Sequence, residues 1–222
     1  MKTDHFIVKQ GELPVILSVR HDGYRKTVGG KLLPLRTDDQ KRRDINTRFL
    51  AESIYKDIFE KKRKKVSLII NTVQRRYETD EMIQRYDEAV KKLVTSSQTF
   101  PVLLLDIHGF SSKFSLGSYD MILGTDHRNS LGSSNIDTVF TVCMAERGYR
   151  VYCPSKEQVE GELFGATTMK TLVKRSTKWN IPNLISMQIE VYRDFRVGEE
   201  GKKKGKQLAV EISNFLLNNF LK

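Results

Sequence analysis

The feature that most constrains the fold is a repeated alternation of short apolar runs with longer segments of helical periodicity. The apolar runs predict strands at 14–21, 66–73, 101–108, 120–125, 149–154 and 184–196, and the periodic segments predict helices at 37–62, 80–96, 136–148, 166–180 and from about 206 onward. Near-continuous apolar strands that alternate with helices are typical of a sheet buried on both faces. We therefore expect an α/β fold, a three-layer sandwich in which helices cover both faces of a mixed, mostly parallel sheet.

Length and composition predict one domain over 1–222. The chain has 222 residues, of which 39% are hydrophobic, and we find no internal repeat or interdomain linker. No stretch approaches the roughly 18 uncharged apolar residues of a membrane span, and the segment MKTDHFIVKQGELPVI lacks the apolar centre of a secretory signal. Two cysteines, Cys143 and Cys153, are too few for a disulfide framework. These features predict a soluble, cytoplasmic protein without membrane contact.

The formal net charge of +11 favours anionic partners. Lysine runs lie at 61–65 (KKRKK) and 202–206 (KKKGK), but no ribonucleoprotein-type aromatic motif, helix-turn-helix pattern or zinc-finger spacing accompanies them. Runs of this kind are usually solvated surface. Nucleic acid binding is therefore possible but not favoured by the sequence.

Polar side chains end several of the predicted apolar strands. His21 follows VILSVR, His108 follows LLLDI, and Glu190 lies within ISMQIEVYR. Sites in such sheets collect at the carboxyl ends of the strands, and two histidines with a carboxylate as third ligand form the open arrangement of catalytic zinc. Alone, His21 could be an ordinary loop histidine, and Glu190 could lie on a strand face open to water.

Asp106 and His108 are less easily explained as solvent-exposed side chains than His21 or Glu190. Positions i and i+2 share one face of a strand, so both side chains would point the same way from a buried sheet. A buried carboxylate requires a cation, a histidine N–H or a metal as partner. The pattern thus indicates either a structural Asp–His pair or a carboxylate that orients a metal-binding histidine.

Six segments, in order, resemble the N-formylglutamate amidohydrolase family, which is related in fold to the zinc carboxypeptidases. They are ILSVRHDGY, RRDINTRFLAESI, LIINTVQRR, LLLDIHGF, MILGTDHRNS and LISMQIEVYRDFR, and they extend from roughly residue 14 to 196. The positions that match family motifs are His21 and Gly23, Asp44 and Thr47, Asp106, His108 and Gly109, and Gln188, Glu190, Arg193 and Arg196.

The resemblance implies a hydrolase that cleaves an amide or N-acyl bond of a small carboxylate-bearing substrate, N-formylglutamate-like or a small peptide, with one zinc ion per chain. It implies His21 and His108 as ligands with Asp44 as the third, and Asp22 beside His21 is the alternative third ligand. The remaining roles that it implies are Glu190 as general base, Asp106 as the carboxylate supporting a histidine ligand, and Arg75 and Arg193 as partners of a substrate carboxylate.

Two departures from the family pattern leave the acyl group open. Arg20 stands where the family commonly has proline before its first histidine, and Thr79, Asp80 and Glu81 follow Arg75 where the family places an aspartate and then Asn-Arg. The alternative hypothesis is a non-catalytic basic protein that binds nucleic acid or another polyanion on a hydrolase-like scaffold, through the lysines at 61–65 and 202–206.

Overall fold

Seven strands form one mixed sheet in the order β1-β5-β2-β6-β9-β7-β8, and a separate two-stranded hairpin is formed by β3 and β4. The computed structural model describes residues 5–28, 31–34, 44–111, 119–154 and 165–221. The strands are β1 (Phe6–Lys9), β2 (Val15–Val19), β3 (Arg25–Val28), β4 (Lys31–Pro34), β5 (Ser67–Asn71), β6 (Val102–Phe110), β7 (Met121–Gly124), β8 (Val151–Tyr152) and β9 (Leu184–Tyr192). The helices are α1 (Thr47–Lys62), α2 (Asp80–Thr95), α3 (Ile136–Ala145), α5 (Leu172–Ser176) and α6 (Gly198–Asn219), with short 3-10 turns η2 (Arg75–Tyr77) and η3 (Arg193–Phe195).

The central strands of the large sheet are parallel. β2 pairs in parallel with β5 and β6, β6 pairs in parallel with β9, and β7 pairs in parallel with β8. Two pairs are antiparallel, β1 with β5 and β7 with β9. The expected mixed, mostly parallel sheet is therefore confirmed.

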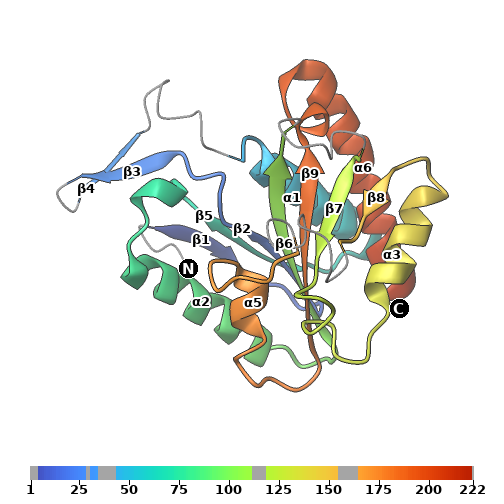
Figure 1. Cartoon of the computed structure of the whole chain (residues 1–222), viewed down its shortest axis with the longest axis horizontal. Helices are drawn as coiled ribbons and strands as arrows, with labels where there is room; N and C mark the ends of the chain where they lie inside the picture. The colour runs from blue at the N-terminus through green and yellow to red at the C-terminus, as the bar shows by residue number, and fades with distance from the viewer. Residues whose placement is uncertain (1–4, 29–30, 35–43, 112–118, 155–164, 222) are drawn as a thin grey trace.

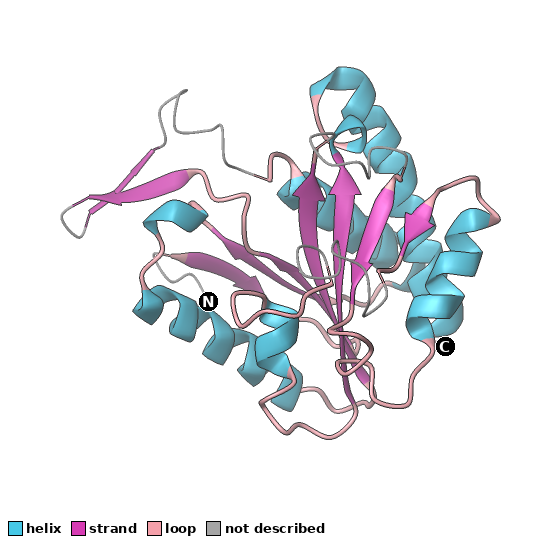
Figure 2. Cartoon of the chain, viewed as in Figure 1, coloured by secondary structure: helices cyan, strands magenta, loops and turns pink. Residues whose placement is uncertain are grey.

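Helices cover both faces of this sheet, which gives three layers (Figures 1 and 2). Odd-numbered residues of β6, such as Leu105, share one apolar core with α1, α3 and α6. Even-numbered residues, such as Leu104, belong to a second core with Tyr86 and Val90 of α2 and Leu172 of α5. The period of two along each strand separates these cores.

Several boundaries differ from the sequence predictions. β1 and the β3–β4 hairpin were not predicted, and the hairpin projects from the body in Figure 1. Of the helix predicted at 37–62, residues 37–43 lie outside the described residues and the rest begins at Thr47. The helix predicted at 166–180 is confined to Leu172–Ser176. The last strand ends at Tyr192 rather than at 196.

The final helix begins at Gly198, eight residues earlier than expected, across a segment with three glycines. Glycine disfavours helix, which is why the sequence indicated a later start. Here a Cβ at Gly205 would lie 2.2 Å from the carbonyl oxygen of Phe195. The glycine therefore allows α6 to pack closely against η3, and this tertiary contact overrides the local propensity.

The two lysine runs lie near opposite ends of α1. Lys61 Nζ is 2.9 Å from Asn214 Oδ1, whereas Gly205 lies beside Phe49 at the start of α1. A polyanion bound by both runs would have to extend along most of this 16-residue helix, about 24 Å. None of the helices in the described part of the chain is long and apolar enough to span a membrane.

Candidate metal centre

The predicted site residues meet at the carboxyl ends of the central parallel strands. His21 lies two residues after β2, His108 lies within β6, and Glu190 of β9 is the direct neighbour of His108 in the sheet register. All three residues are less than a tenth exposed. The parallel arrangement thus brings together residues that are far apart in the sequence.

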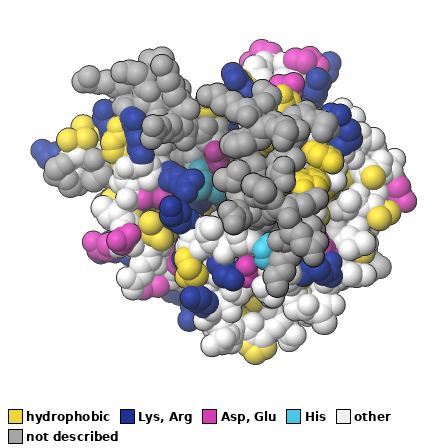
Figure 3. Space-filling model, in the orientation of Figure 1, with side chains coloured by type: hydrophobic (Ala, Val, Ile, Leu, Met, Phe, Trp, Pro, Cys, Tyr) yellow, Lys and Arg dark blue, Asp and Glu magenta, His cyan; other side chains and the backbone are white. Residues whose placement is uncertain are grey.

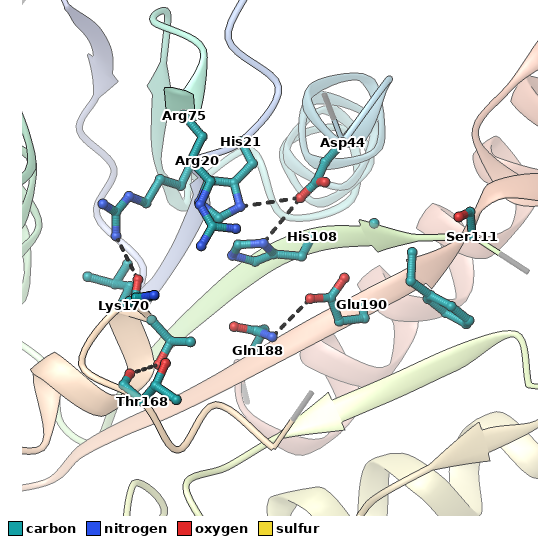
Figure 4. A pocket seen from close by; sticks show the side chains of 14 residues that line it. Arg20, His21, Asp44, Arg75, His108, Ser111, Thr168, Lys170, Gln188 and Glu190 are labelled. Atoms are coloured by element: carbon teal, nitrogen blue, oxygen red, sulfur yellow. Dashed lines mark hydrogen bonds and ion pairs between the residues drawn. The ribbon is translucent and has the colours of Figure 1, made fainter. Parts of the chain in front are cut away.

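Two imidazoles converge on one carboxylate oxygen (Figure 4). Nδ1 of His21 is 3.5 Å, and Nδ1 of His108 is 3.2 Å, from Oδ2 of Asp44. The two imidazole rings are nearly perpendicular, with their centroids 4.4 Å apart. One potential ligand atom from each of these three residues lies within 4.8 Å of the other two. The cluster can therefore present two nitrogen donors and one oxygen donor to a single metal ion.

Asp44 is held by a backbone turn immediately before α1. Its N–H donates to the carbonyl of His21 at 3.2 Å, and its own carbonyl accepts from the N–H and Oγ1 of Thr47 at 3.1 and 2.9 Å. Asp22, the alternative ligand, instead accepts the backbone N–H of Arg48 at 3.0 Å in the first turn of α1. The structure thus groups Asp44, and not Asp22, with the two histidines.

A buried hydrogen-bond chain fixes the ring of His108 from behind. Nε2 of His108 is 2.9 Å from Oδ2 of Asp106, and Oδ1 of Asp106 accepts from the Ser18 hydroxyl at 2.6 Å. Ser18 Oγ is in turn 3.0 Å from Tyr86 Oη. Since Asp106 holds Nε2, Nδ1 of His108 faces Asp44. This is the Asp–His pair that the sequence predicted.

The electrostatics of the cluster favour a bound cation. Burial, together with the neighbouring His108, lowers the pKa of His21 to about 4, so this imidazole is in the neutral form that binds metals. Burial also opposes charging of His108, but the carboxylates of Asp106 and Asp44 outweigh it and raise its pKa well above the usual value. Burial acts to raise the pKa of Asp44, but hydrogen bonds from both histidines keep it low. The carboxylates thus hold a proton on His108, and a metal ion could supply that positive charge instead.

Glu190 lies in the cavity next to this cluster. Burial raises its pKa to about 7, which suits a group that must accept and release a proton near neutral pH. Gln188 Nε2 donates to Glu190 Oε1 at 3.0 Å. Oε1 of Gln188 is buried, has no hydrogen-bond partner among the described residues, and belongs to a side chain that lines the cavity. Within the described part of the chain, the amide therefore leaves one buried acceptor unpaired beside the cavity.

The cavity has a volume of about 480 Å³, and among the described residues three Arg and Lys side chains line it. They are Arg20, Arg75 and Lys170. Arg20 is buried, with Nη2 3.6 Å from Glu78 Oε2, and its Nη1 donates to the carbonyl of Lys170 at 3.3 Å. Arg75 and Lys170 are exposed. In Figure 3, Lys and Arg side chains gather beside a histidine near the centre of the face shown.

Sequence reasoning placed some of these residues correctly and missed others. Arg75 lines the cavity as expected, but Arg193 is exposed in η3 and is not among the described residues that line it. Lys170 was missed because its segment was predicted as helix, whereas it precedes the short α5. One sequence feature could have identified Arg20 as a cavity residue, namely its position directly before His21, a candidate metal ligand.

Comparisons with known proteins support the fold. No protein-family model and no curated protein matches the sequence. The crystal structure of gene product Atu2144 from Agrobacterium tumefaciens matches with a TM-score of 0.66 at 13% identity, covering 98% of this chain and 96% of that chain. A bacteriophage poly-gamma-glutamate hydrolase matches with a TM-score of 0.46 at 11% identity, covering 98% of this chain and 91% of that chain. A metallo-carboxypeptidase from Pseudomonas aeruginosa matches with a TM-score of 0.48 at 10% identity, covering 95% of this chain and 59% of that chain.

The match to the Atu2144 structure shows the shared fold. Membership of the N-formylglutamate amidohydrolase family stays a prediction.

Proposed function

We propose that the protein is a zinc-dependent amidohydrolase with His21, Asp44 and His108 as the metal ligands. The observation that carries this proposal is the convergence of these three buried or nearly buried donors at one point in a cavity that also contains Glu190. Two histidines and one carboxylate fit the ligand set of catalytic zinc, which keeps a further position open. A zinc ion held there would polarise a substrate carbonyl and lower the pKa of water to about 7.

Glu190 is the general base in this proposal. It is the sheet neighbour of His108, and its side chain points into the cavity beside the cluster (Figure 4). It would take a proton from water and later deliver it to the leaving nitrogen. The hydrogen bond from Gln188 Nε2 fixes the carboxylate, and Gln188 Oε1 would accept an N–H of the substrate.

The substrate we propose is a small N-acyl amino acid or peptide that carries a carboxylate. A cavity of about 480 Å³ is in the range of small-molecule sites. Arg75 and Lys170 are the lining cations that solvent reaches, and a guanidinium can bind a carboxylate through two hydrogen bonds. The resemblance to the N-formylglutamate amidohydrolases supports the same class of substrate.

Metal analysis tests the proposal directly. The purified chain, expressed with added zinc, should contain about one zinc ion, and His21→Ala and His108→Ala should each lose it because a three-ligand site becomes a two-ligand site. His5→Ala is the matched control and should leave the zinc content unchanged, since His5 lies outside the cluster, directly before β1. A wild-type chain that neither contains zinc nor binds it on reconstitution would overturn the proposal.

A further inference from the structure

The three proposed ligands are not held in the same way. His21 and His108 come from the ends of central strands, but Asp44 belongs to the turn before α1. The position of its carboxylate therefore depends on whatever fixes this turn against the sheet. Arg196, which follows η3 and is only 4% exposed, makes that connection.

The guanidinium of Arg196 donates to carbonyl oxygens of three separate segments. Nε bonds to Val191 in β9 at 3.0 Å, and Nη2 bonds to Phe110 at the end of β6 at 3.2 Å. Nη1 bonds to Ile45, the residue directly after Asp44. In the opposite direction, Asn46 Nδ2 donates to the Arg196 carbonyl at 2.5 Å. One arginine thus ties the turn of Asp44 to the ends of both central strands.

Two backbone features accommodate this clamp. A Cβ at Gly109 would lie 2.2 Å from Cζ of Arg196, so the guanidinium lies against bare backbone beside His108. Asn46 adopts a left-handed conformation with φ 65°, which asparagine takes more readily than most non-glycine residues. In this conformation its side chain donates to the Arg196 carbonyl.

We propose that Arg196 is a positioning residue that sets the location of Asp44 relative to the two histidines. This inference rests on the proposed metal site. This positioning role requires the planar guanidinium of arginine, whose N–H donors point in different directions. A lysine would keep the positive charge, but its donors share one nitrogen and cannot reach carbonyls on three segments.

The first test compares zinc affinity by calorimetric titration of the full chain. Arg196→Lys should bind zinc about 10- to 100-fold more weakly, the usual cost of losing a residue that orients a ligand. The visible absorption of the cobalt-loaded protein should change as well, because it reports ligand geometry. Arg175→Lys is the matched control, since Arg175 is another largely buried arginine that binds Asp87 in α2 and the Met169 carbonyl. It should retain wild-type affinity, and equal zinc affinity in Arg196→Lys and wild type would overturn the inference.

A double-mutant cycle with Asp44→Asn separates positioning from general structural damage. If Arg196 acts through Asp44, the double variant should bind zinc no more weakly than Asp44→Asn alone. If the two losses multiply, Arg196 does not act through Asp44 and the inference fails. Should Arg196→Lys not fold, Gly109→Ala serves instead, because its methyl group displaces the guanidinium while the arginine remains. Wild-type protein without zinc binding would contradict the proposed function rather than this inference.

Discussion

The two faces of the β6–β9 pair differ although they share one backbone. On the face toward α1 and α6, both strands are apolar to their carboxyl ends, through Leu105 and Ile107 on β6 and Met187 and Ile189 on β9. On the face toward α2, β6 begins with Val102 and Leu104 but continues with Asp106 and His108, beside Gln188 and Glu190. Successive residues of one strand therefore point in opposite directions, one into the apolar core and the next into the candidate site.

The helices account for this difference. α1 and α6 have 16 and 22 residues and share a core with the first face as far as Ile107 and Val191. On the second face the core shared with α2 and α5 ends at Leu104 on β6, and a separate apolar cluster begins only at Phe110. α5 has only 5 residues, and the cavity lies beyond the first of these cores. Buried polar groups there are costly unless paired, and Asp106 and His108 are paired. One face thus contributes to the apolar core along its whole length, and the other carries the candidate site.

The strongest test of this comparison is Glu190→Gln on the polar face. The substitution keeps the shape of the side chain but removes the proposed base, so hydrolysis of the proposed N-acyl amino acid substrates, such as N-formylglutamate, should fall about 10²- to 10⁴-fold. Zinc content should stay at the wild-type level, since Glu190 is not a proposed ligand. Steady-state kinetics and metal analysis measure the two effects, and Ile189→Val, one residue away on the apolar face, is the control. Wild-type rates in Glu190→Gln would remove Glu190 from the mechanism.

The second test is Ile107→Ala, between Asp106 and His108 but on the apolar face. Ile107 is 1% exposed, so the cavity left behind should lower the free energy of unfolding by about 2–5 kcal/mol. Zinc affinity of the folded protein should not change. Denaturant unfolding gives the stability, and Ile107→Val should show a smaller loss of about 0.5–1.5 kcal/mol. Loss of zinc without loss of stability would contradict the separation of the two faces.

Ser18→Ala tests a residue that should affect both the stability of the protein and its affinity for zinc. Ser18 donates to Asp106 at 2.6 Å, and its loss leaves a buried carboxylate with one partner fewer, at a cost of about 1–3 kcal/mol. Zinc affinity should fall about 10-fold because Asp106 orients His108. Ser213→Ala is the control, since this buried hydroxyl donates to the helix carbonyls of Ala209 and Ile54, away from the candidate site. It should not alter zinc affinity.

The smallest expected effect is that of Asp22→Ala. Its carboxylate accepts the N–H of Arg48 in the first turn of α1, and loss of such a helix-terminal acceptor costs about 0.5–2 kcal/mol. Zinc should be retained, whereas Asp44→Ala should lose it. Thermal unfolding and metal analysis of the two variants measure these effects. Zinc lost in Asp22→Ala and kept in Asp44→Ala would reverse the choice of third ligand.

The central strands and the polar ends of β2, β6 and β9 could be predicted because their signal is local. Apolar runs that stop at His21 or continue through Asp106 and His108 are visible in the sequence itself. The β3–β4 hairpin was not predicted although two glycines separate its short strands, because charged residues interrupt the apolar pattern. The early start of α6 depends on packing against η3, which no local pattern encodes.

The candidate site was only partly predictable for the same reason. Residues that match a family pattern could be proposed, such as Asp44 and Glu190. The role of Arg196 could not be proposed, because it depends on carbonyl groups of residues 45, 110 and 191, which every residue type possesses. Lys170 lines the cavity from a segment whose sequence pattern predicts a helix. Its actual position depends on the tertiary fold and could not be predicted locally.

The sheet order has a consequence for how the chain is synthesised. Among the strands of the described residues, β9 comes last in the sequence, yet it fills the gap between β6 and β7. Until it emerges, those two strands present unpaired edges to other nascent chains, a situation that favours aggregation. The candidate site, which includes Glu190 of β9, and the protection of the sheet edges are thus completed in the same late event.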